Sequence, residues 1–228
     1  MTDFVFAPAA PATVPVAGSQ QVYPVRRIYC VGRNYLDHIR EMGQDERQPP
    51  FFFQKPTDSI VLDGAAVRYP TSTQDFQFEI ELVLAIGKSG ADISVENAAE
   101  YVFGAAVGID FTRRDLQLKA RDTGRPWEAG KSFDESAPIS AIVPLENGEL
   151  PTTGAISLDV NGEQRQSGDL EQLIWNCAEI VSQLSKQYRL EPGDLIYTGT
   201  PAGVGPVLPG DKIVGRIAGL PNLNVAVV

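Results

Sequence analysis

The chain has 228 residues, and 19 Lys and Arg residues against 29 Asp and Glu residues give it a formal net charge of −10 at pH 7. Such an acidic chain repels a phosphate backbone, which argues against a nucleic-acid partner, and its single histidine excludes histidine-rich metal sites. Since no apolar stretch reaches the roughly 20 residues that cross a bilayer and the N-terminus lacks the pattern of a secretory signal, we expect a cytoplasmic globular protein with no membrane partner.

The N-terminal residues 1–24 are rich in Ala, Pro and Val. This composition favours extended or polyproline geometry and predicts an arm or a small edge element. Regular structure is expected to start with a strand over residues 27–31, followed by a short helix over 33–42. Residues 25–228 contain no domain linker and no internal repeat, so we expect them to form one domain.

Short apolar runs follow in the next part of the chain. Residues 51–53 and 59–62 are predicted strands. Asp63-Gly64 is a typical two-residue hairpin turn, so we expect 59–62 to pair with a further strand over 66–69.

The clearest periodicity lies at residues 75–86. Every second position from 76 to 86 is Phe, Ile or Leu, and polar residues including Glu79 and Glu81 stand between them in the first half. Side chains alternate between the two faces of a strand, so strict period two predicts one strand with a single buried face.

The rest of the chain continues as short strands with a few helices between them. The predicted elements are a weak helix over 94–102, a buried strand over 104–111, a helix over 112–121, a hairpin strand over 156–160 with its turn at Asn161-Gly162, an apolar helix over 170–184 capped by Asp169, a strand over 194–198 and a final strand near the C-terminus. Strands outnumber helices, which predicts a β-dominated α+β fold.

Glu79 and Glu81 are expected to project from the same face of their strand, because residues i and i+2 share a face. The pair alone is most simply explained as part of a solvated polar face. Asp110, at the end of the buried run 105–109, favours a second explanation, because three carboxylates brought together repel one another unless a cation lies between them. With oxygen as the only donor type, the set favours Mg²⁺, Mn²⁺ or Ca²⁺ over zinc.

His38 and Glu41 would be neighbours on one helix face if their segment is helical. A carboxylate beside an imidazole raises its basicity and fixes its tautomer, as a general base that acts on water requires. A surface histidine in a weak helix salt bridge is the simpler explanation, and the spacing alone favours it.

Lys131 ends a basic segment, since residues 112–131 hold six basic and three acidic residues. Such a segment could bind an anionic substrate, although a lysine beside glycine is usually a solvated loop residue. The loop 198–206 is rich in Gly and Pro but lacks the Gly-Lys-Ser/Thr ending of a phosphate-binding loop. Its hydroxyls and N–H groups could hold a carboxylate, or it could be a plain turn.

Together these motifs resemble the fumarylacetoacetate hydrolase family. The segments that carry the resemblance are 29–35, 78–82, 108–115, 130–134 and 198–205. Residues 49–56 and 126–128 are also similar to those of the fumarylpyruvate hydrolases of aromatic degradation, and the acylpyruvases share the same motifs.

The resemblance implies a mixed β-sandwich roll of the family's C-terminal-domain type. Residues 25–228 would form the single catalytic domain, and the chain would be a homodimer. The resemblance further implies a Mg²⁺ or Mn²⁺ ion held by Glu79, Glu81 and Asp110.

The resemblance also implies which residues act on the substrate, a small anionic 2,4-dioxo acid. His38, held by Glu41 on a lid segment, would deprotonate the water that attacks the acyl carbonyl. Lys131 would stabilise the pyruvate enolate that leaves. The residues expected to contact the substrate are Arg114, Gln117, Lys131 and Thr200. The reaction implied is hydrolysis of fumarylpyruvate to fumarate and pyruvate in the degradation of gentisate or salicylate.

Other functions remain open at this point. The same metal–enolate core would support decarboxylation of oxaloacetate, hydration or isomerisation of oxo-dienoates, and tautomerisation. A decarboxylase needs no attacking water and should tolerate the loss of His38, whereas a hydratase or isomerase yields one product rather than two. In a different class, a non-catalytic divalent-cation or anion-binding module would bind metal without turnover of any 2,4-dioxo acid.

Overall fold

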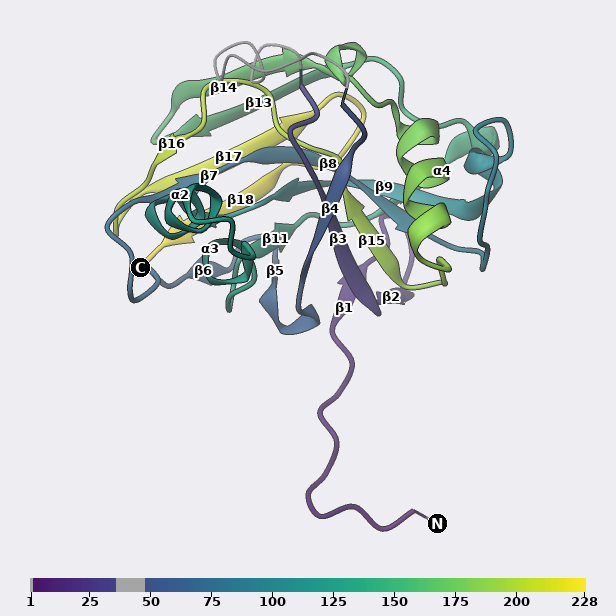
Figure 1. The fold of residues 1–228 in the computed structure, drawn as a ribbon, viewed down its shortest axis with the longest axis horizontal. Coiled ribbons are helices and arrows are strands. Elements are labelled where there is room, and N and C mark those ends of the chain that lie inside the picture. The colour runs from purple at the N-terminus through teal and green to yellow at the C-terminus, as the bar shows by residue number, and fades with distance from the viewer. Residues whose placement is uncertain (1, 36–47) are drawn as a thin grey trace.

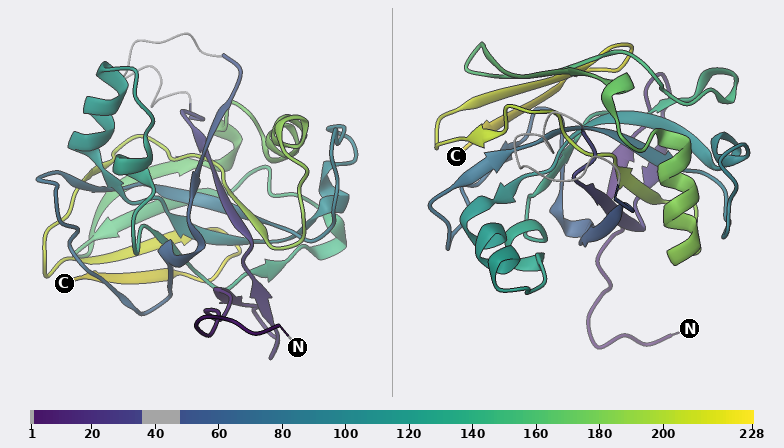
Figure 2. Two further views of the ribbon diagram at one scale, coloured as in Figure 1. Left: turned by 60° about the horizontal axis from the view of Figure 1, so that its bottom comes forward. Right: turned by 45° about the horizontal axis from the view of Figure 1, so that its top comes forward.

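Two β-sheets packed face to face form the body of the molecule. The computed structural model describes residues 2–35 and 48–228 (Figure 1). An eight-stranded and a five-stranded sheet both contribute to the main apolar core, and both sheets are curled (Figure 2). The structure therefore confirms the prediction of a β-dominated α+β fold.

The eight-stranded sheet has the order β4-β3-β15-β8-β9-β11-β5, and β12 pairs with β9. Its strands are β3 (Arg27–Gly32), β4 (Phe51–Lys55), β5 (Ile60–Leu62), β8 (Ile80–Ile86), β9 (Val102–Ile109), β11 (Ala137–Ile139), β12 (Val143–Pro144) and β15 (Asp194–Tyr197). The predicted strands confirmed in this sheet are those at 27–31, 51–53, 59–62, 104–111 and 194–198.

The five-stranded sheet has the order β14-β13-β17-β18-β6. Its strands are β6 (Ala66–Val67), β13 (Ala155–Val160), β14 (Glu163–Asp169), β17 (Lys212–Ile217) and β18 (Leu223–Val227). The turn between β13 and β14 is the predicted one, and both Asn161 and Gly162 have the positive φ that such a two-residue turn requires.

Smaller elements complete the fold. The two-stranded sheet consists of β1 (Thr13–Pro15) and β2 (Val22–Pro24), and the three-stranded sheet of β7 (Phe76–Phe78), β10 (Thr112–Arg113) and β16 (Gly205–Pro206). The helices are α2 (Arg114–Asp122), α3 (Glu128–Lys131) and α4 (Cys177–Gln187), with 3-10 turns η1 (Thr57–Ser59), η2 (Ala98–Tyr101), η3 (Glu146–Gly148) and η4 (Leu170–Gln172).

The predicted strand over 75–86 is interrupted at Glu79, and both of its faces are buried. Leu82 and Leu84 point into the main core between the two sheets. Val83 and Ala85 point the other way, into a second apolar cluster. The prediction of a single buried face is therefore wrong, because this strand lies in the middle of a sheet that is covered on both sides.

The predicted hairpin at Asp63-Gly64 is also wrong. A tight turn does form there, with Gly64 at a φ of 78°. The strand before it, β5, pairs in parallel with β11, whereas β6 after it pairs in parallel with β18. The turn therefore carries the chain from one sheet to the other, and tertiary pairing overrides the local hairpin signal.

The predicted apolar helix over 170–184 begins later than expected. Asp169 caps the short turn η4, and α4 starts at Cys177 with its own capping box from Asn176 and Glu179. Leu173, an apolar position between the two caps, is buried without being helical. Two caps with acceptor side chains seven residues apart explain why one continuous helix does not form.

The N-terminal hairpin of β1 and β2 covers the outer face of the eight-stranded sheet. Val14 and Tyr23 lie in the second apolar cluster together with Ile28 and Leu195. Residues 2–11 before the hairpin are exposed and extend away from the body (Figure 1). In the described residues, no helix is long and apolar enough to span a membrane.

Candidate active site

Three buried carboxylates meet at one end of the paired strands β8 and β9. Glu79 lies between β7 and β8, Glu81 lies in β8, and Asp110 follows β9. The antiparallel pairing sets Glu81 opposite Gly108. One oxygen from each carboxylate lies within 4.8 Å of the others. The structure thus brings together the three acids that the sequence analysis connected.

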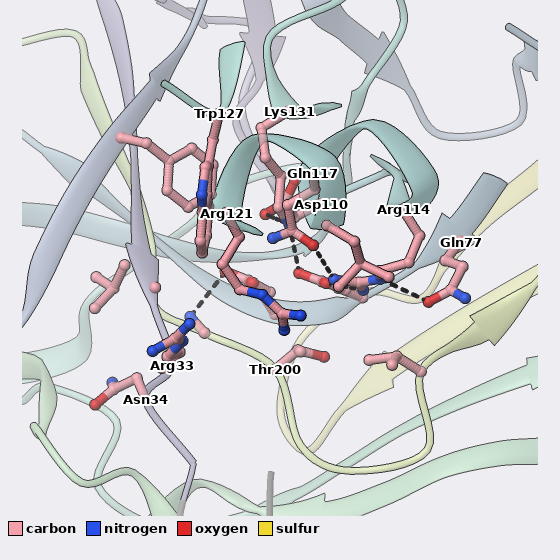
Figure 3. Close-up of a pocket in the computed structure, with 18 of the residues that line it drawn as sticks. Arg33, Asn34, Gln77, Asp110, Arg114, Gln117, Arg121, Trp127, Lys131 and Thr200 are labelled. Carbon is pink, nitrogen blue, oxygen red and sulfur yellow. Dashed lines mark hydrogen bonds and ion pairs between the residues drawn. The ribbon is translucent and has the colours of Figure 1, made fainter. Parts of the chain in front are cut away.

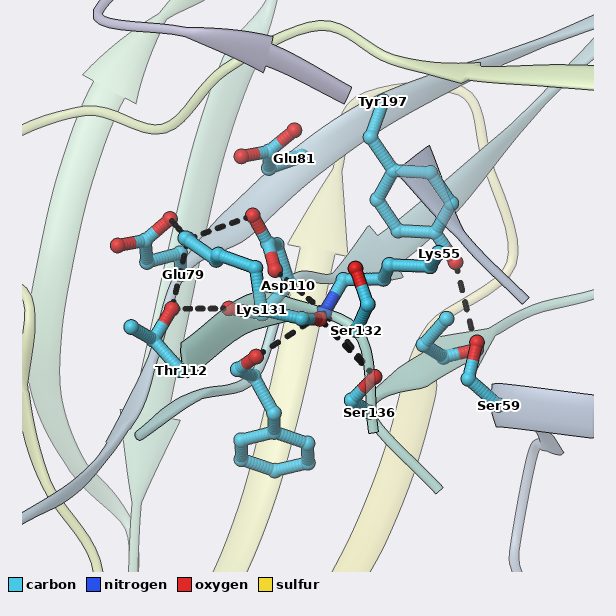
Figure 4. A network of polar contacts seen from close by, with 12 residues as sticks. Lys55, Ser59, Glu79, Glu81, Asp110, Thr112, Lys131, Ser132, Ser136 and Tyr197 are labelled. Carbon is cyan, nitrogen blue, oxygen red and sulfur yellow. Dashed lines mark hydrogen bonds and ion pairs between the residues drawn. The ribbon is translucent and has the colours of Figure 1, made fainter. Parts of the chain in front are cut away.

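Two buried lysines contact Glu79 and Asp110, two of these carboxylates (Figure 4). Lys131 Nζ lies 2.7 Å from both Glu79 Oε2 and Asp110 Oδ2. It also donates to the hydroxyl of Thr112 at 2.7 Å. Lys55 Nζ lies 2.8 Å from Asp110 Oδ1. The two ammonium groups therefore hold Asp110 by both of its carboxylate oxygens.

Lys55 is a site residue that the sequence analysis missed. Its ammonium group also donates to Phe111 O at 3.1 Å, to Ser136 Oγ at 3.0 Å and to the carbonyl of Lys131. The side chain is fully buried. The sequence did offer one signal for Lys55, because it ends the apolar strand Phe51–Lys55. A lysine that is buried at the end of such a strand needs charged or polar partners.

The electrostatics of the cluster are unfavourable at Glu81. Burial, together with the charges of Asp110 and Glu79, raises the pKa of Glu81 well above its usual range. Burial alone would lower the pKa of Lys131. The negative charges of Asp110 and Glu79 outweigh burial and raise this pKa, so the ammonium stays charged. An additional cation beside Glu81 would relieve the repulsion among the carboxylates.

The donor set fits a hard divalent cation. All three side chains offer carboxylate oxygen, the ligand type that Mg²⁺ and Mn²⁺ prefer. Glu81 also accepts a hydrogen bond at 2.8 Å from the backbone N–H of Gly199, which fixes one of its oxygens. Glu79, Glu81 and Asp110 could therefore hold such an ion.

Arg114 and Gln117 lie beside the carboxylates on helix α2. They are three residues apart and so share a helix face, and the Arg114 guanidinium donates to the side-chain oxygen of Gln117. Arg114 also forms an ion pair with Glu79 and donates through Nε to Gln77 Oε1 at 2.8 Å (Figure 3). The start of α2 is thus tied directly to the carboxylate cluster.

Thr200 lies in the loop after β15, on the wall of the same cavity. Gln166 of β14 donates through Nε2 to Thr200 Oγ1 at 2.8 Å and accepts from Ile80 N at 2.9 Å. Gly199 has a φ of 103°, and a Cβ there would lie 2.7 Å from the side chain of Asn34. The loop therefore needs this glycine and is held against β8.

A cavity of about 370 Å³ opens over these groups, within the size range of small-molecule sites. Its lining in the described residues is Val31, Gly32, Arg33, Asn34, Phe53, Asp75, Gln77, Glu79, Glu81, Asp110, Arg114, Gln117, Leu118, Arg121, Trp127, Lys131, Gly199, Thr200 and Val204. The predicted residues Arg114, Gln117, Lys131 and Thr200 are thus in one cavity with the carboxylates. His38 and Glu41, and most of the helix predicted over 33–42, lie outside the described residues.

Comparison with known proteins finds relatives that share most of the chain. The family model for the fumarylacetoacetate (FAA) hydrolase C-terminal domain matches residues 27–228. A fumarylpyruvate hydrolase of Ralstonia sp is 51% identical over 177 residues, which are 78% of this chain and 92% of the relative. The mitochondrial oxaloacetate tautomerase of Bos taurus is 41% identical over 202 residues, 89% of this chain and 91% of the relative. The crystal structure of fumarylpyruvate hydrolase from Pseudomonas aeruginosa in complex with Mn²⁺ and pyruvate is 54% identical, covers 99% of both chains and has a TM-score of 0.95.

Proposed function

The chain belongs to the fumarylacetoacetate hydrolase family, and we propose that it hydrolyses fumarylpyruvate to fumarate and pyruvate. The observation that carries this proposal is the buried cluster of Glu79, Glu81 and Asp110 beside Lys131, which lines a cavity of about 370 Å³. The relatives named as fumarylpyruvate hydrolases, one of them solved with Mn²⁺ and pyruvate, support the same substrate.

We assign Glu79, Glu81 and Asp110 to a bound Mg²⁺ or Mn²⁺ ion. The all-oxygen donor set and the raised pKa of Glu81 support this assignment. When bound, such an ion supplies a Lewis acid that polarises the oxygens of a 2-oxo acid and stabilises developing negative charge.

The proposed reaction adds water across a carbon–carbon bond. His38, oriented by Glu41, takes a proton from water, and the water oxygen bonds to the acyl carbonyl carbon distant from the 2-oxo acid. The bond from that carbon to the pyruvate methylene carbon breaks, and its electron pair goes to the pyruvate enolate. The enolate then takes up the proton, and pyruvate leaves together with fumarate.

Lys131 is the residue we propose to stabilise the enolate charge. Its ammonium is buried, stays charged and lies 2.7 Å from Asp110, next to the proposed cation site. A charge fixed in advance in a dry site stabilises developing negative charge more strongly than one in water. Arg114, Gln117 and Thr200, on the same cavity wall, are proposed to orient the 2-oxo acid.

An ultraviolet assay of the purified protein with Mg²⁺ tests this function. Fumarylpyruvate, maleylpyruvate, acetylpyruvate and oxaloacetate are offered separately, and the products are identified by mass spectrometry. We expect the highest kcat/KM with fumarylpyruvate and two products, fumarate and pyruvate. Dominant activity on oxaloacetate would overturn the proposal.

A tautomerase is the second candidate function, because a relative with 41% identity is named an oxaloacetate tautomerase. Tautomerisation interconverts the keto and enol forms and breaks no carbon–carbon bond. The same assay separates the two functions, since a tautomerase leaves the mass of oxaloacetate unchanged and forms no pyruvate.

We further propose that residues 25–228 form one catalytic domain and that the chain acts in the cytoplasm as a homodimer. The family match over residues 27–228 supports the single domain, and the similarity to a bacterial relative supports the location. Size-exclusion chromatography with light scattering tests the oligomeric state. A monomeric mass at assay concentration would contradict the dimer.

A further inference from the structure

Two arginines that line the cavity, Arg33 and Arg121, are not among the residues assigned to the reaction. Arg33 lies on the side opposite Gln77 and Arg114, and Arg121 lies between them (Figure 3). Arg33 lies over the ring of Trp127, with its guanidinium carbon 6.0 Å from the ring centroid. The cavity therefore has a carboxylate-rich part and a second part with the Arg33 guanidinium and an aromatic wall, and Arg121 lies between the two.

The two guanidinium groups are close enough to affect each other. Burial, and in addition the positive charge of Arg121, lowers the pKa of Arg33. Like charges in one cavity repel, and an anion between them removes that repulsion. Arg121 forms an ion pair at 2.9 Å with Asp122, whose side chain is 63% exposed. Exposed pairs of this kind are weak, so Arg121 can exchange Asp122 for an anion in the cavity.

The backbone holds Arg33 in a strained conformation that aims its side chain into the cavity. Its φ is 59°, which is uncommon for a residue other than glycine. On one side, the backbone of Gly32 lies against the Phe51 ring, which leaves no room for a side chain. On the other side, Asn34 donates to Thr198 O at 2.8 Å and to Trp175 O at 2.9 Å. Strain fixed by its surroundings in this way is concentrated at functional sites.

We propose that Arg33 and Arg121 form a second anion subsite, which binds a carboxylate at the far end of the acyl group. The inference rests on the proposed function and names its substrate class: 2,4-dioxo acids whose acyl group ends in a carboxylate. The planar guanidinium fork matches carboxylate geometry, and Trp127 offers an apolar wall to the chain between the two charged ends. Arg114 and Lys131, which contact Glu79 and Asp110, serve the 2-oxo acid end.

A binding experiment with two uncleavable acids tests the subsite directly. 2-Oxoheptanedioate and 2-oxoheptanoate have the same chain length, and only the first ends in a second carboxylate. Calorimetry in the presence of Mn²⁺ measures the Kd of each. We expect the wild-type protein to bind the diacid about 10-fold more tightly or better, because a hydrogen-bonded charge pair is worth that much. Equal affinity for the two acids, or binding of neither, would overturn the proposal.

Arg121→Gln and Arg125→Gln form a matched pair of variants. Both arginines are exposed to some degree in the same basic segment, but only Arg121 lines the cavity. We expect Arg121→Gln to reduce the diacid preference to about 2-fold or less and Arg125→Gln to keep it. The subsite would be contradicted if Arg121→Gln kept the preference for the diacid, or if both variants lost this preference equally. Because Arg121 lies on a helix surface, we expect Arg121→Gln to keep the fold. Arg33→Gln is measured as a second variant only, because Arg33 lies in a strained part of the backbone.

Turnover is measured separately on the same samples. If the wild type does not cleave fumarylpyruvate, the proposed function fails, but the comparison of the two acids still decides the subsite. If it does, Arg121→Gln should lose kcat/KM on fumarylpyruvate by about 10-fold and change little on acetylpyruvate, which lacks the second carboxylate. An equal loss on both substrates would contradict the assigned role.

Discussion

The charge balance at the carboxylate cluster depends on Lys55, which is buried and lies 2.8 Å from Asp110. Lys55→Met leaves the buried acids with one cation fewer, so we expect the free energy of unfolding of the metal-free protein to fall by about 3–5 kcal/mol. Urea denaturation measures this change. Lys88→Met is the control, because Lys88 pairs with Glu100 at the surface and should change stability little. Equal effects of the two substitutions would contradict the role of burial.

His38 is the only imidazole in the chain, and the proposed reaction needs a base for the attacking water. We expect His38→Ala to lower kcat on fumarylpyruvate by roughly 10²–10⁴-fold, the usual contribution of general-base catalysis. Steady-state kinetics with Mg²⁺ measures the loss. Unchanged turnover would remove the dyad of His38 and Glu41 from the mechanism.

Individual residues differ in how far the sequence predicts them. Glu79, Glu81 and Asp110 could be connected because strand periodicity puts two acids on one face and a third at the end of a buried run. Lys55 could not be connected, since 76 residues separate it from Lys131 and only the packing of helix α3 against strand β4 brings them together. Arg33 could not be singled out within segment 29–35 either, because its left-handed backbone leaves no pattern in the sequence.

At the scale of elements, α2 carries two arginines of the cavity, Arg114 and Arg121, and its position depends on how its first turn is anchored. Asp115 accepts hydrogen bonds from Thr73 Oγ1 at 2.6 Å and from the backbone N–H of Gln74 and of Leu116, both at 2.9 Å. Burial acts to raise the pKa of Asp115, but these hydrogen bonds outweigh it and lower the pKa. The ionised carboxylate therefore stabilises the fold.

Asp115→Asn should consequently destabilise the protein in a pH-dependent way. A lowered pKa gives stability that is present above the usual aspartate range and is lost as pH falls through the folded-state pKa. We expect a loss of about 1–2 kcal/mol at neutral pH that shrinks towards zero in acid, measured by denaturation across that range. Asp122→Asn, at the exposed end of the same helix, is the control and should change stability little at neutral pH, because its ion pair with Arg121 is exposed. A difference between Asp115→Asn and wild type that is the same at every pH would contradict this account.

The two predicted hairpin turns show where local sequence patterns no longer suffice to predict which strands pair. The Asn161-Gly162 hairpin is predicted correctly because its turn and both strands agree. The Asp63-Gly64 turn forms too, but its flanking strands find partners in different sheets. Local turn chemistry sets a change of direction, and only long-range pairing decides which strands become neighbours.

At the scale of the whole molecule, the fold is stabilised by two apolar clusters on opposite faces of one sheet. The carboxylates are an exception inside this packing: Glu81 is 1% exposed, and its pKa is raised by burial and by Asp110 and Glu79. A raised pKa makes the folded state hold a proton that the unfolded state releases. Without metal, stability should therefore fall as pH rises from the usual glutamate range towards the raised pKa.

Glu81→Gln and added Mn²⁺ together test this link between the site and the stability of the whole fold. In chelator, Glu81→Gln should be at least as stable as wild type at about pH 8 and should lose the fall in Tm between about pH 5 and pH 8. Mn²⁺ binds only the folded state, so at 100 times its Kd it should stabilise the wild type by about 2.7 kcal/mol and leave Glu81→Gln nearly unchanged, because the neutral amide is a weaker ligand. A variant less stable than wild type at pH 8 without metal would contradict the electrostatic account. An equal rise in Tm for both proteins with Mn²⁺ would show that Glu81 does not contribute to the cation site.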